Sequence, residues 1–195
     1  MVSLMSKLMM IVASTRPGRV GLPVSKWFGT CVEQHGAFEL EVVDLLELNL
    51  PFMDEPKHPR FADYQHQHTK DWSSRVDAAD AFAIVMPEYN YGFNAPIKNA
   101  IDFLYREWHY KPAGLVSYGG IAAGTRAAQM LKQVLTTVKL TVPSEAVAIP
   151  FVAKLLNDDG TIEPNDSMQR SAFALLDELV RLDRVLLTLR NGDAS

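Results

Sequence analysis

The chain has 195 residues, of which 48% are hydrophobic and 22% charged, and its formal net charge is -4 at pH 7. This length and composition predict one domain, residues 1–195, that buries a sizeable core. The weak acidic charge argues against nucleic acid or an anionic membrane as a partner, and no apolar run is long enough to cross a bilayer. The single cysteine excludes an intrachain disulfide, which fits a cytoplasmic location.

Short apolar runs bounded by Gly, Pro or polar residues recur along the chain. Runs of this length are typical of strands that are covered on both faces of a sheet. The predicted strands are Leu8–Ala13, Phe38–Val43, Ala81–Met86, Gly114–Tyr118 and a weaker one at Glu145–Ile149.

Amphipathic helices are predicted between these strands, because hydrophobic residues recur at the i, i+3, i+4 and i+7 spacing of one helix face. The helical patterns cover Val24–Cys31, Ile97–Leu104, Ala127–Val134 and Ala172–Leu186, with a further crossover helix at Thr69–Ala78. The last helix is expected to open at Pro164–Asp166 and to close at Asn191-Gly192. Three prolines indicate an irregular loop at Asn49–Asp63.

Alternating strands and helices imply parallel strands joined by right-handed crossovers. The predicted fold class is α/β, a three-layer α/β/α sandwich whose five-stranded parallel sheet has the order 2-1-3-4-5. In such sheets ligands bind beyond the carboxyl ends of the strands, near the point where strand order reverses. Three loops are therefore candidates for a binding site: Ser14–Gly21, Pro87–Asn94 and Tyr118–Gly124.

The first loop precedes a predicted helix and is rich in groups that bind anions. It contains the hydroxyls of Ser14 and Thr15, the guanidinium groups of Arg16 and Arg19, and a glycine turn. Free backbone N–H groups and the helix dipole favour an anion at a helix N-terminus, and arginine adds charge-assisted bonds to a phosphate. The loop is interpreted as a phosphate site. The alternative is a polar connection with solvated arginines.

The other two loops suit the contact surface of a flat heterocycle. Pro87–Asn94 places aromatic side chains beside backbone amides, although these aromatics could equally pack the loop onto the next helix. Tyr118–Gly124 contains three glycines, which let the backbone approach a ring closely and present N–H groups to its edge. A plain turn would also explain them, and Thr125-Arg126 stands where a P-loop would have Lys-Ser/Thr.

Three motifs together resemble the NADPH-dependent FMN reductase family. They are Ser14-Thr15-Arg16-Pro17-Gly18-Arg19, then Pro87-Glu88-Tyr89-Asn90 followed by Lys98-Asn99-Ala100-Ile101-Asp102, and finally Ser117-Tyr118-Gly119-Gly120. The similarity runs from about Lys7 to Pro150, and the motifs come in the family's order at predicted strand ends. The family is flavodoxin-like, usually dimeric or tetrameric, and includes flavin, quinone, azo-dye and metal-ion reductases.

The resemblance implies a site for FMN. Carried over by position, the residues that would contact the phosphate are Ser14, Thr15, Arg16, Arg19, Val20 and Gly21. Those that would line the isoalloxazine ring are Pro87, Glu88, Tyr89 and Asn90. Those at the pyrimidine edge of the ring would be Tyr118, Gly119, Gly120 and Gly124. The chain departs from the family's pattern at Ala13, Gly92 and Asn94-Ala95. These departures leave the phosphate donors intact and change the residues that shape the surface over the ring, where the acceptor would bind.

The two arginines of the first loop are expected to act differently. Arg16 would make the main contact with the phosphate, whereas Arg19 lies a turn further along, where its head can reach water. The alternative is that Arg16 braces the loop against a carboxylate such as Glu88.

The implied activity is that of an oxidoreductase that passes hydride from NAD(P)H through bound FMN to a small acceptor by a ping-pong mechanism. Because hydride transfer is the chemistry of the cofactor, no catalytic residue is predicted, and Lys98, Asn99 and Asp102 are expected to cap and brace the second loop. The alternative is an FMN-binding electron carrier or redox-responsive partner without significant turnover. The modest charge favours the enzyme.

No metal site is expected, because His66 and His68 are two residues apart and would point apart on a helix. A homodimer or homotetramer is expected from an aromatic segment that is more than one helix face can bury. The alternative is that this segment is a lid packed on its own subunit. That segment contains Phe103, Tyr105, Trp108 and Tyr110.

Overall fold

The computed structural model describes residues 5–192 and contains one five-stranded parallel sheet. Its strands are β1 (Ser6–Val12), β2 (Phe38–Asp44), β3 (Ala81–Pro87), β4 (Ala113–Tyr118) and β5 (Val147–Ile149). Their order is β2-β1-β3-β4-β5, so the predicted order is confirmed. This is the arrangement of flavodoxin-like proteins, in which the strand order reverses between β1 and β3.

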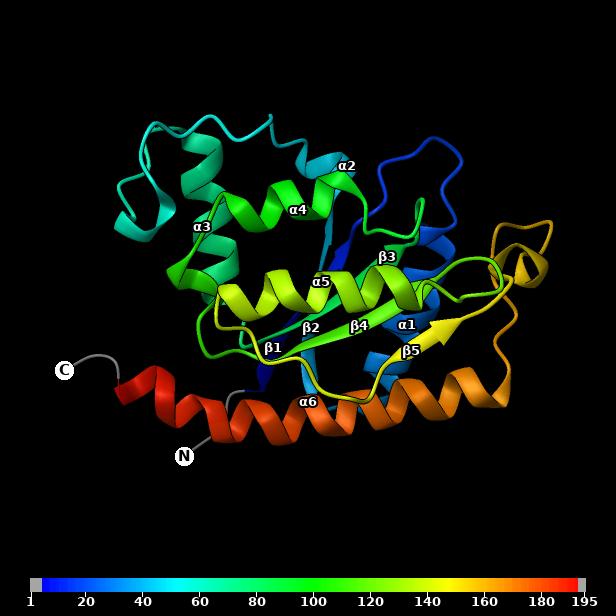
Figure 1. The fold of residues 1–195 in the computed structure, drawn as a ribbon. Helices are drawn as coiled ribbons and strands as arrows, with labels where there is room; N and C mark the ends of the chain where they lie inside the picture. Colours follow the sequence, from blue (N-terminus) through cyan, green and yellow to red (C-terminus); the bar gives the residue numbers. More distant parts are fainter. Residues whose placement is uncertain (1–4, 193–195) are drawn as a thin grey trace.

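The helices cover both faces of the sheet (Figure 1). They are α1 (Gly21–His35), α2 (Leu45–Leu48), α3 (Gln67–Ala78), α4 (Ala95–Asp102), α5 (Thr125–Thr137) and α6 (Asp166–Gly192), with 3-10 turns at Pro59–Phe61, Arg106–Trp108 and Val152–Leu155. The pair α1 and α6 lies on one face, and α3, α4 and α5 lie on the other. The short α2 was not predicted; Asp44 caps it by accepting a hydrogen bond from the Leu46 N–H at 3.0 Å.

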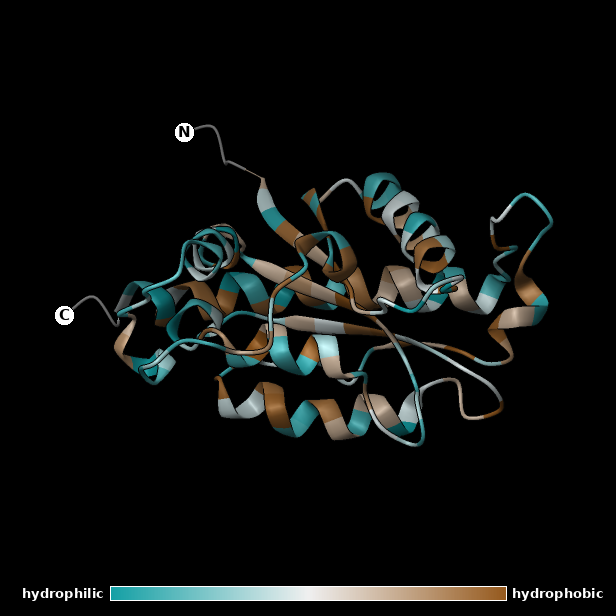
Figure 2. Cartoon of the chain, turned by 90° about the horizontal axis from the view of Figure 1, so that it is seen from above, coloured by the Kyte–Doolittle hydropathy of each residue, from teal (hydrophilic) through white to brown (hydrophobic). Residues whose placement is uncertain are grey.

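Each face of the sheet has its own hydrophobic core. Ile84 contributes to the core under α3, α4 and α5, whereas its neighbour Val85 contributes to the core under α1 and α6. Because successive strand residues enter opposite cores, the central strand β3 is apolar and buried throughout, as the sequence indicated, whereas the edge strand β2 alternates with Glu39 and Glu41. Figure 2 shows the complementary pattern, with hydrophobic and hydrophilic bands alternating along the helices that cover the sheet.

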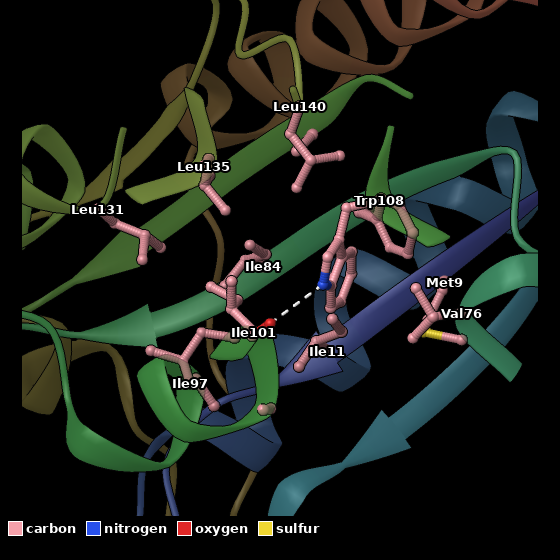
Figure 3. Close-up of a cluster of buried hydrophobic side chains, with 14 of the residues drawn as sticks. Met9, Ile11, Val76, Ile84, Ile97, Ile101, Trp108, Leu131, Leu135 and Leu140 are labelled. Carbon is pink, nitrogen blue, oxygen red and sulfur yellow. Dashed lines mark hydrogen bonds between the residues drawn. The ribbon is translucent and has the colours of Figure 1, made fainter. Parts of the chain in front are cut away.

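The aromatic segment that was expected to form an interface between subunits packs inside its own chain. Phe103 and Trp108 are fully buried, and the Trp108 ring meets Phe82 edge-on with the ring centroids 4.9 Å apart. The Trp108 indole N–H also donates to the Ile101 carbonyl at 3.2 Å (Figure 3). Helix α4 ends at Asp102, and the following 3-10 turn folds the segment back onto the sheet. These aromatics therefore do not support the expected oligomer.

The irregular loop and the two histidines also differ in detail from expectation. Residues 49–63 are irregular apart from one 3-10 turn, but the rings of His66 and His68 are stacked, with centroids 5.2 Å apart and planes 5° apart. They do not diverge, because His66 is the N-cap of α3 and lies outside its helical turns. Within residues 5–192, no group of three or more His, Cys, Asp or Glu residues is placed to hold a metal ion. The same residues include no helix long and apolar enough to span a bilayer.

Candidate functional site

The three predicted loops meet at the carboxyl edge of the sheet. The Ser14 and Tyr89 hydroxyls lie 3.0 Å apart and join the first loop to the second. The Glu88 N–H donates to the Tyr118 carbonyl at 3.2 Å and joins the second loop to the third. Tyr118 also reaches back to the first loop, since its hydroxyl lies beside Gly21. One compact group of contacts therefore connects the ends of β1, β3 and β4.

The N-terminus of α1 is open to an anion. Its N-cap residue, Val20, makes no side-chain cap, and the first turn contains no acidic residue. The first N–H groups of a helix have no partner within the helix and carry a partial positive charge. A Cβ at Gly21 would lie 2.7 Å from the Tyr118 hydroxyl, so a larger residue there would displace this hydroxyl. Ser14, buried at the end of β1, places a hydroxyl at the same place.

Two buried polar atoms at the carboxyl edge of the sheet lack a hydrogen-bond partner in the described chain. They are the hydroxyl of Tyr118 and the Oδ1 atom of Asn94, whose amide Nδ2 donates to the Ala13 carbonyl at 2.5 Å. Burial raises the pKa of Tyr118 well above its usual value, so its hydroxyl stays protonated and available as a donor. An unpaired buried hydroxyl is costly, and a ligand with oxygen acceptors beside Gly21 would satisfy it.

The two arginines of the first loop have different surroundings. The guanidinium group of Arg19 pairs with Asp44 and donates to the Ser14 carbonyl at 2.9 Å, and only 7% of its side chain is exposed. The prediction that its head reaches water is therefore wrong, because the start of α2 brings the Asp44 carboxylate against it. Arg16 is exposed, and its guanidinium group has no partner among residues 5–192. Glu88 does not brace it, since that carboxylate pairs with Arg126.

The second loop turns sharply between Tyr89 and Gly92. These two residues exchange both backbone hydrogen bonds at 2.9 Å, and the residues between them, Asn90 and Tyr91, have φ values of 51° and 71°. Two successive positive φ values define a type I′ turn, which favours Asn-Gly over a bulky second residue. The turn is therefore conformationally strained at Tyr91.

The third loop leads into α5, whose N-terminus is already capped. One oxygen of Glu88 accepts from the Arg126 backbone N–H at 3.2 Å, and the other pairs with the Arg126 guanidinium group at 2.9 Å. That guanidinium group lies over the Tyr91 ring, 4.1 Å from its centroid. Sequence reasoning did not select Arg126, because nothing near it in the chain signals a partner 38 residues away.

The three glycines of the third loop have different surroundings. The Gly119 N–H donates to the Ile149 carbonyl at 3.2 Å. It is therefore not directed toward a ligand, contrary to the expectation that the glycines present their N–H groups to a ring. A Cβ at Gly124 would lie 2.8 Å from the backbone of Tyr118, so no other residue fits there. Gly120 is exposed, and a Cβ there would meet nothing within 4 Å. A flat group could therefore approach the backbone most closely at Gly120.

The polar residues of α4 were expected to cap and brace the second loop, but their side chains bond elsewhere. Lys98 and Asp102 pair with each other along the helix at 2.5 Å. Asn99 donates to the Pro51 carbonyl at 2.7 Å and accepts from the Met53 N–H at 3.0 Å. The brace therefore ties α4 to the irregular segment after α2.

A cavity of about 440 Å³ lies between α2 and α4 and borders the first loop at Thr15. Most of its lining is aliphatic, and its polar side chains are those of Thr15, Asn49 and Asn99. Because it contains no charged side chain, it does not suit a phosphate. It does suit an apolar group next to the first loop.

Comparisons with known proteins identify relatives of this chain. The family model for NADPH-dependent FMN reductase matches residues 6–154. The chain is 40% identical over 138 residues to an NAD(P)H-dependent FMN reductase of Schizosaccharomyces pombe, covering 70% of this chain and 68% of that protein.

Solved structures give the same answer for the fold. The flavoenzyme NAD(P)H:(acceptor) oxidoreductase of Paracoccus denitrificans has a TM-score of 0.72 at 23% identity, covering 92% of this chain and 97% of that one. An archaeal flavodoxin has a TM-score of 0.58 at 13% identity, covering 91% and 99%. At these identities the likeness shows the fold alone.

Proposed function

The chain belongs to the NADPH-dependent FMN reductase family, and we propose that its three loops hold FMN and use it to reduce a small acceptor with NAD(P)H. The activity is that of an NAD(P)H-dependent oxidoreductase, and we propose a flavin, quinone, azo compound or metal ion as the acceptor. The two substrates would use the site in turn, giving ping-pong kinetics. We treat residues 1–195 as one FMN-binding domain.

The observation that carries the proposal is the open N-terminus of α1. A terminal phosphate there would accept hydrogen bonds from the backbone N–H groups, from Ser14 and from the unpartnered Tyr118 hydroxyl. The unpartnered, exposed guanidinium group of Arg16 would add a charge-assisted bond. Thr15, Val20 and Gly21 complete this phosphate loop, and Arg19 supports it through the Ser14 carbonyl.

The ring of FMN would lie between the second and third loops. Pro87–Asn90 would form one wall, and Tyr118, Gly119, Gly120 and Gly124 would form the other, with closest approach at Gly120. When bound, FMN supplies the hydride chemistry. The residues of this chain bind and orient it, and none of them needs to act as an acid or base.

Flavin titration tests the proposal directly. Fluorescence quenching should show that FMN binds more tightly than FAD or riboflavin, because the helix N-terminus suits a terminal phosphate. The protein with FMN should then oxidise NADPH or NADH steadily in the presence of quinones, flavins or azo dyes. Absence of flavin binding at micromolar concentration would overturn the proposal. Binding without turnover would establish the electron carrier instead.

We also propose a homodimer or homotetramer, now on different residues. Large apolar side chains remain exposed around the site, including Phe52, Tyr91 and Ile121, at 87%, 65% and 79%. Exposed apolar groups gathered beside a binding site are typical of protein interfaces. Light scattering at working concentration should give the mass of two or four chains, and a monomeric mass would overturn this proposal.

A further inference from the structure

The turn of the second loop is held from both sides by side chains of its neighbours. On one side the Tyr89 hydroxyl contacts the Ser14 hydroxyl. On the other side the Arg126 guanidinium group lies on the Tyr91 ring and pairs with Glu88. The first contact leads to the phosphate loop, and the second leads to α5.

The contacts on the α5 side form a closed set. Glu88 has only 10% of its side chain exposed, and both of its oxygens bind Arg126, one through the backbone N–H and one through the guanidinium group. The same guanidinium group stacks on Tyr91, the residue with φ 71°. Cation–π contacts and ion pairs each contribute modestly when exposed. Here one side chain makes both contacts to a single turn.

A bulky residue at positive φ persists only where its surroundings hold it. Tyr91 is mostly exposed and makes no hydrogen bond within the described chain, so core packing does not fix it. The Arg126 guanidinium group lies over its ring. The arginine is therefore placed where it can hold the strained turn.

We propose that Arg126 is a positioning residue for the flavin ring. By pairing with Glu88 and stacking on Tyr91, it holds the strained turn at Asn90–Tyr91 and so fixes the distance between the second and third loops. This inference rests on the proposed function, because the groove between those loops is where the ring would lie. Arg126 itself does not contact the phosphate site, which is formed at α1.

The first test needs no flavin. In Arg126→Ala, the amide protons of Tyr89 and Gly92, which close the turn, should exchange with solvent at least tenfold faster than in the unaltered protein. Arg181→Ala is the matched control, since it removes a surface arginine paired with Glu178 on α6. It should leave both exchange rates unchanged. Unchanged exchange in Arg126→Ala would overturn the proposal.

The second test uses FMN and riboflavin on the same variants. Arg126→Ala should weaken both ligands by a similar factor, on the order of tenfold, because the ring groove is altered and the phosphate loop is intact. Arg126→Lys should recover only part of this loss, because it keeps a charge for Glu88 without the planar guanidinium group. Loss confined to FMN would make Arg126 a phosphate ligand and overturn the proposal.

A double-mutant cycle separates positioning from general destabilisation. Glycine adopts positive φ without strain, so the turn in Tyr91→Gly no longer needs to be held. Adding Arg126→Ala to Tyr91→Gly should therefore change riboflavin affinity less than threefold. An equal loss with and without Tyr91 would overturn the coupling. If the unaltered protein binds neither flavin, the proposed function fails, whereas the exchange experiment still decides whether Arg126 holds the turn.

Discussion

Two helices begin within the candidate site, and their N-termini differ in what they hold. At α5 the Glu88 carboxylate accepts a hydrogen bond from the first turn, 3.2 Å from the Arg126 nitrogen. At α1 the first turn has neither a side-chain cap nor an acidic residue. Both termini carry the partial positive charge of a helix. Of these two termini, α1 is the one available to a phosphate, because the first turn of α5 already binds the Glu88 carboxylate.

The difference explains why a glycine-rich loop is a poor guide to phosphate binding. The loop before α5 contains Gly119, Gly120 and Gly124, and its spacing is close to that of a P-loop. The loop before α1 has only Gly18 ahead of the helix. Nevertheless α1 is the terminus that has a buried serine beside it, together with an arginine and a tyrosine hydroxyl that find no partner among residues 5–192. The chemistry around a helix terminus decides its ligand, and the number of glycines does not.

The largest effect is expected from Arg19, which secures the α1 side of the site. Arg19→Ala should lower the free energy of unfolding by about 3 kcal/mol, because it leaves the Asp44 carboxylate, 8% exposed, without its cation. Urea denaturation of the FMN-free protein measures this. Arg16→Ala is the control and should change stability by less than about 0.5 kcal/mol. Equal changes in the two variants would contradict the structural distinction between these arginines.

The second effect concerns Arg16, whose guanidinium group finds no partner within residues 5–192. Arg16→Ala removes one or two charge-assisted hydrogen bonds to the phosphate, each worth roughly 1.5–3 kcal/mol, so FMN affinity should fall by about tenfold to a hundredfold or more. Riboflavin has the same ring without the phosphate, and its affinity should barely change. Fluorescence titration of both ligands gives the ratio. An equal loss for both would mean that the phosphate does not lie at Arg16.

The sequence predicted the architecture well because its signals were local. Strands, helices and their ends are indicated by apolar runs, helical periodicity and Gly or Pro residues within short segments. These signals were enough to predict that the three loops lie at the carboxyl edge of the sheet. The contacts inside those loops could not be predicted from local sequence patterns. Arg19 pairs with a residue 25 positions away, and Glu88 with one 38 positions away. No local pattern indicates such partners.

The aromatic segment after α4 shows the same limit. Helical periodicity counted its rings as surplus, but the helix stops at Asp102 and a 3-10 turn follows. Glu107 stabilises that turn from within, since its buried carboxylate accepts hydrogen bonds from Tyr64 at 2.8 Å and Ser73 at 2.6 Å. These donors come from distant parts of the chain. The end of α4 is thus fixed by tertiary contacts that the helix pattern does not contain.

A smaller effect is expected when the N-terminus of α5 loses its cap. Glu88→Ala removes the cap from the first turn of this helix and should lower the free energy of unfolding by about 1 kcal/mol. Glu88→Gln should lose less, because its amide oxygen can still accept from the Arg126 N–H. Thermal or urea denaturation without flavin measures both. If the two variants lose the same amount, the ion pair rather than the cap stabilises this terminus.

The smallest effect is expected when Tyr118 loses its hydroxyl. This change should leave the stability of the fold unchanged or slightly raised, and it should weaken FMN binding. Tyr118→Phe removes a buried hydroxyl that has no hydrogen-bond partner in the described part of the chain, so the free energy of unfolding should be unchanged or slightly higher. FMN should nevertheless bind about two- to tenfold more weakly, since one neutral hydrogen bond to the phosphate is worth about 0.5–1.5 kcal/mol. Because burial raises the pKa of Tyr118, this difference should persist up to about pH 10. Riboflavin again serves as the control and should bind both proteins alike. A variant that loses stability without losing FMN affinity would show that the hydroxyl serves the fold and not the α1 terminus.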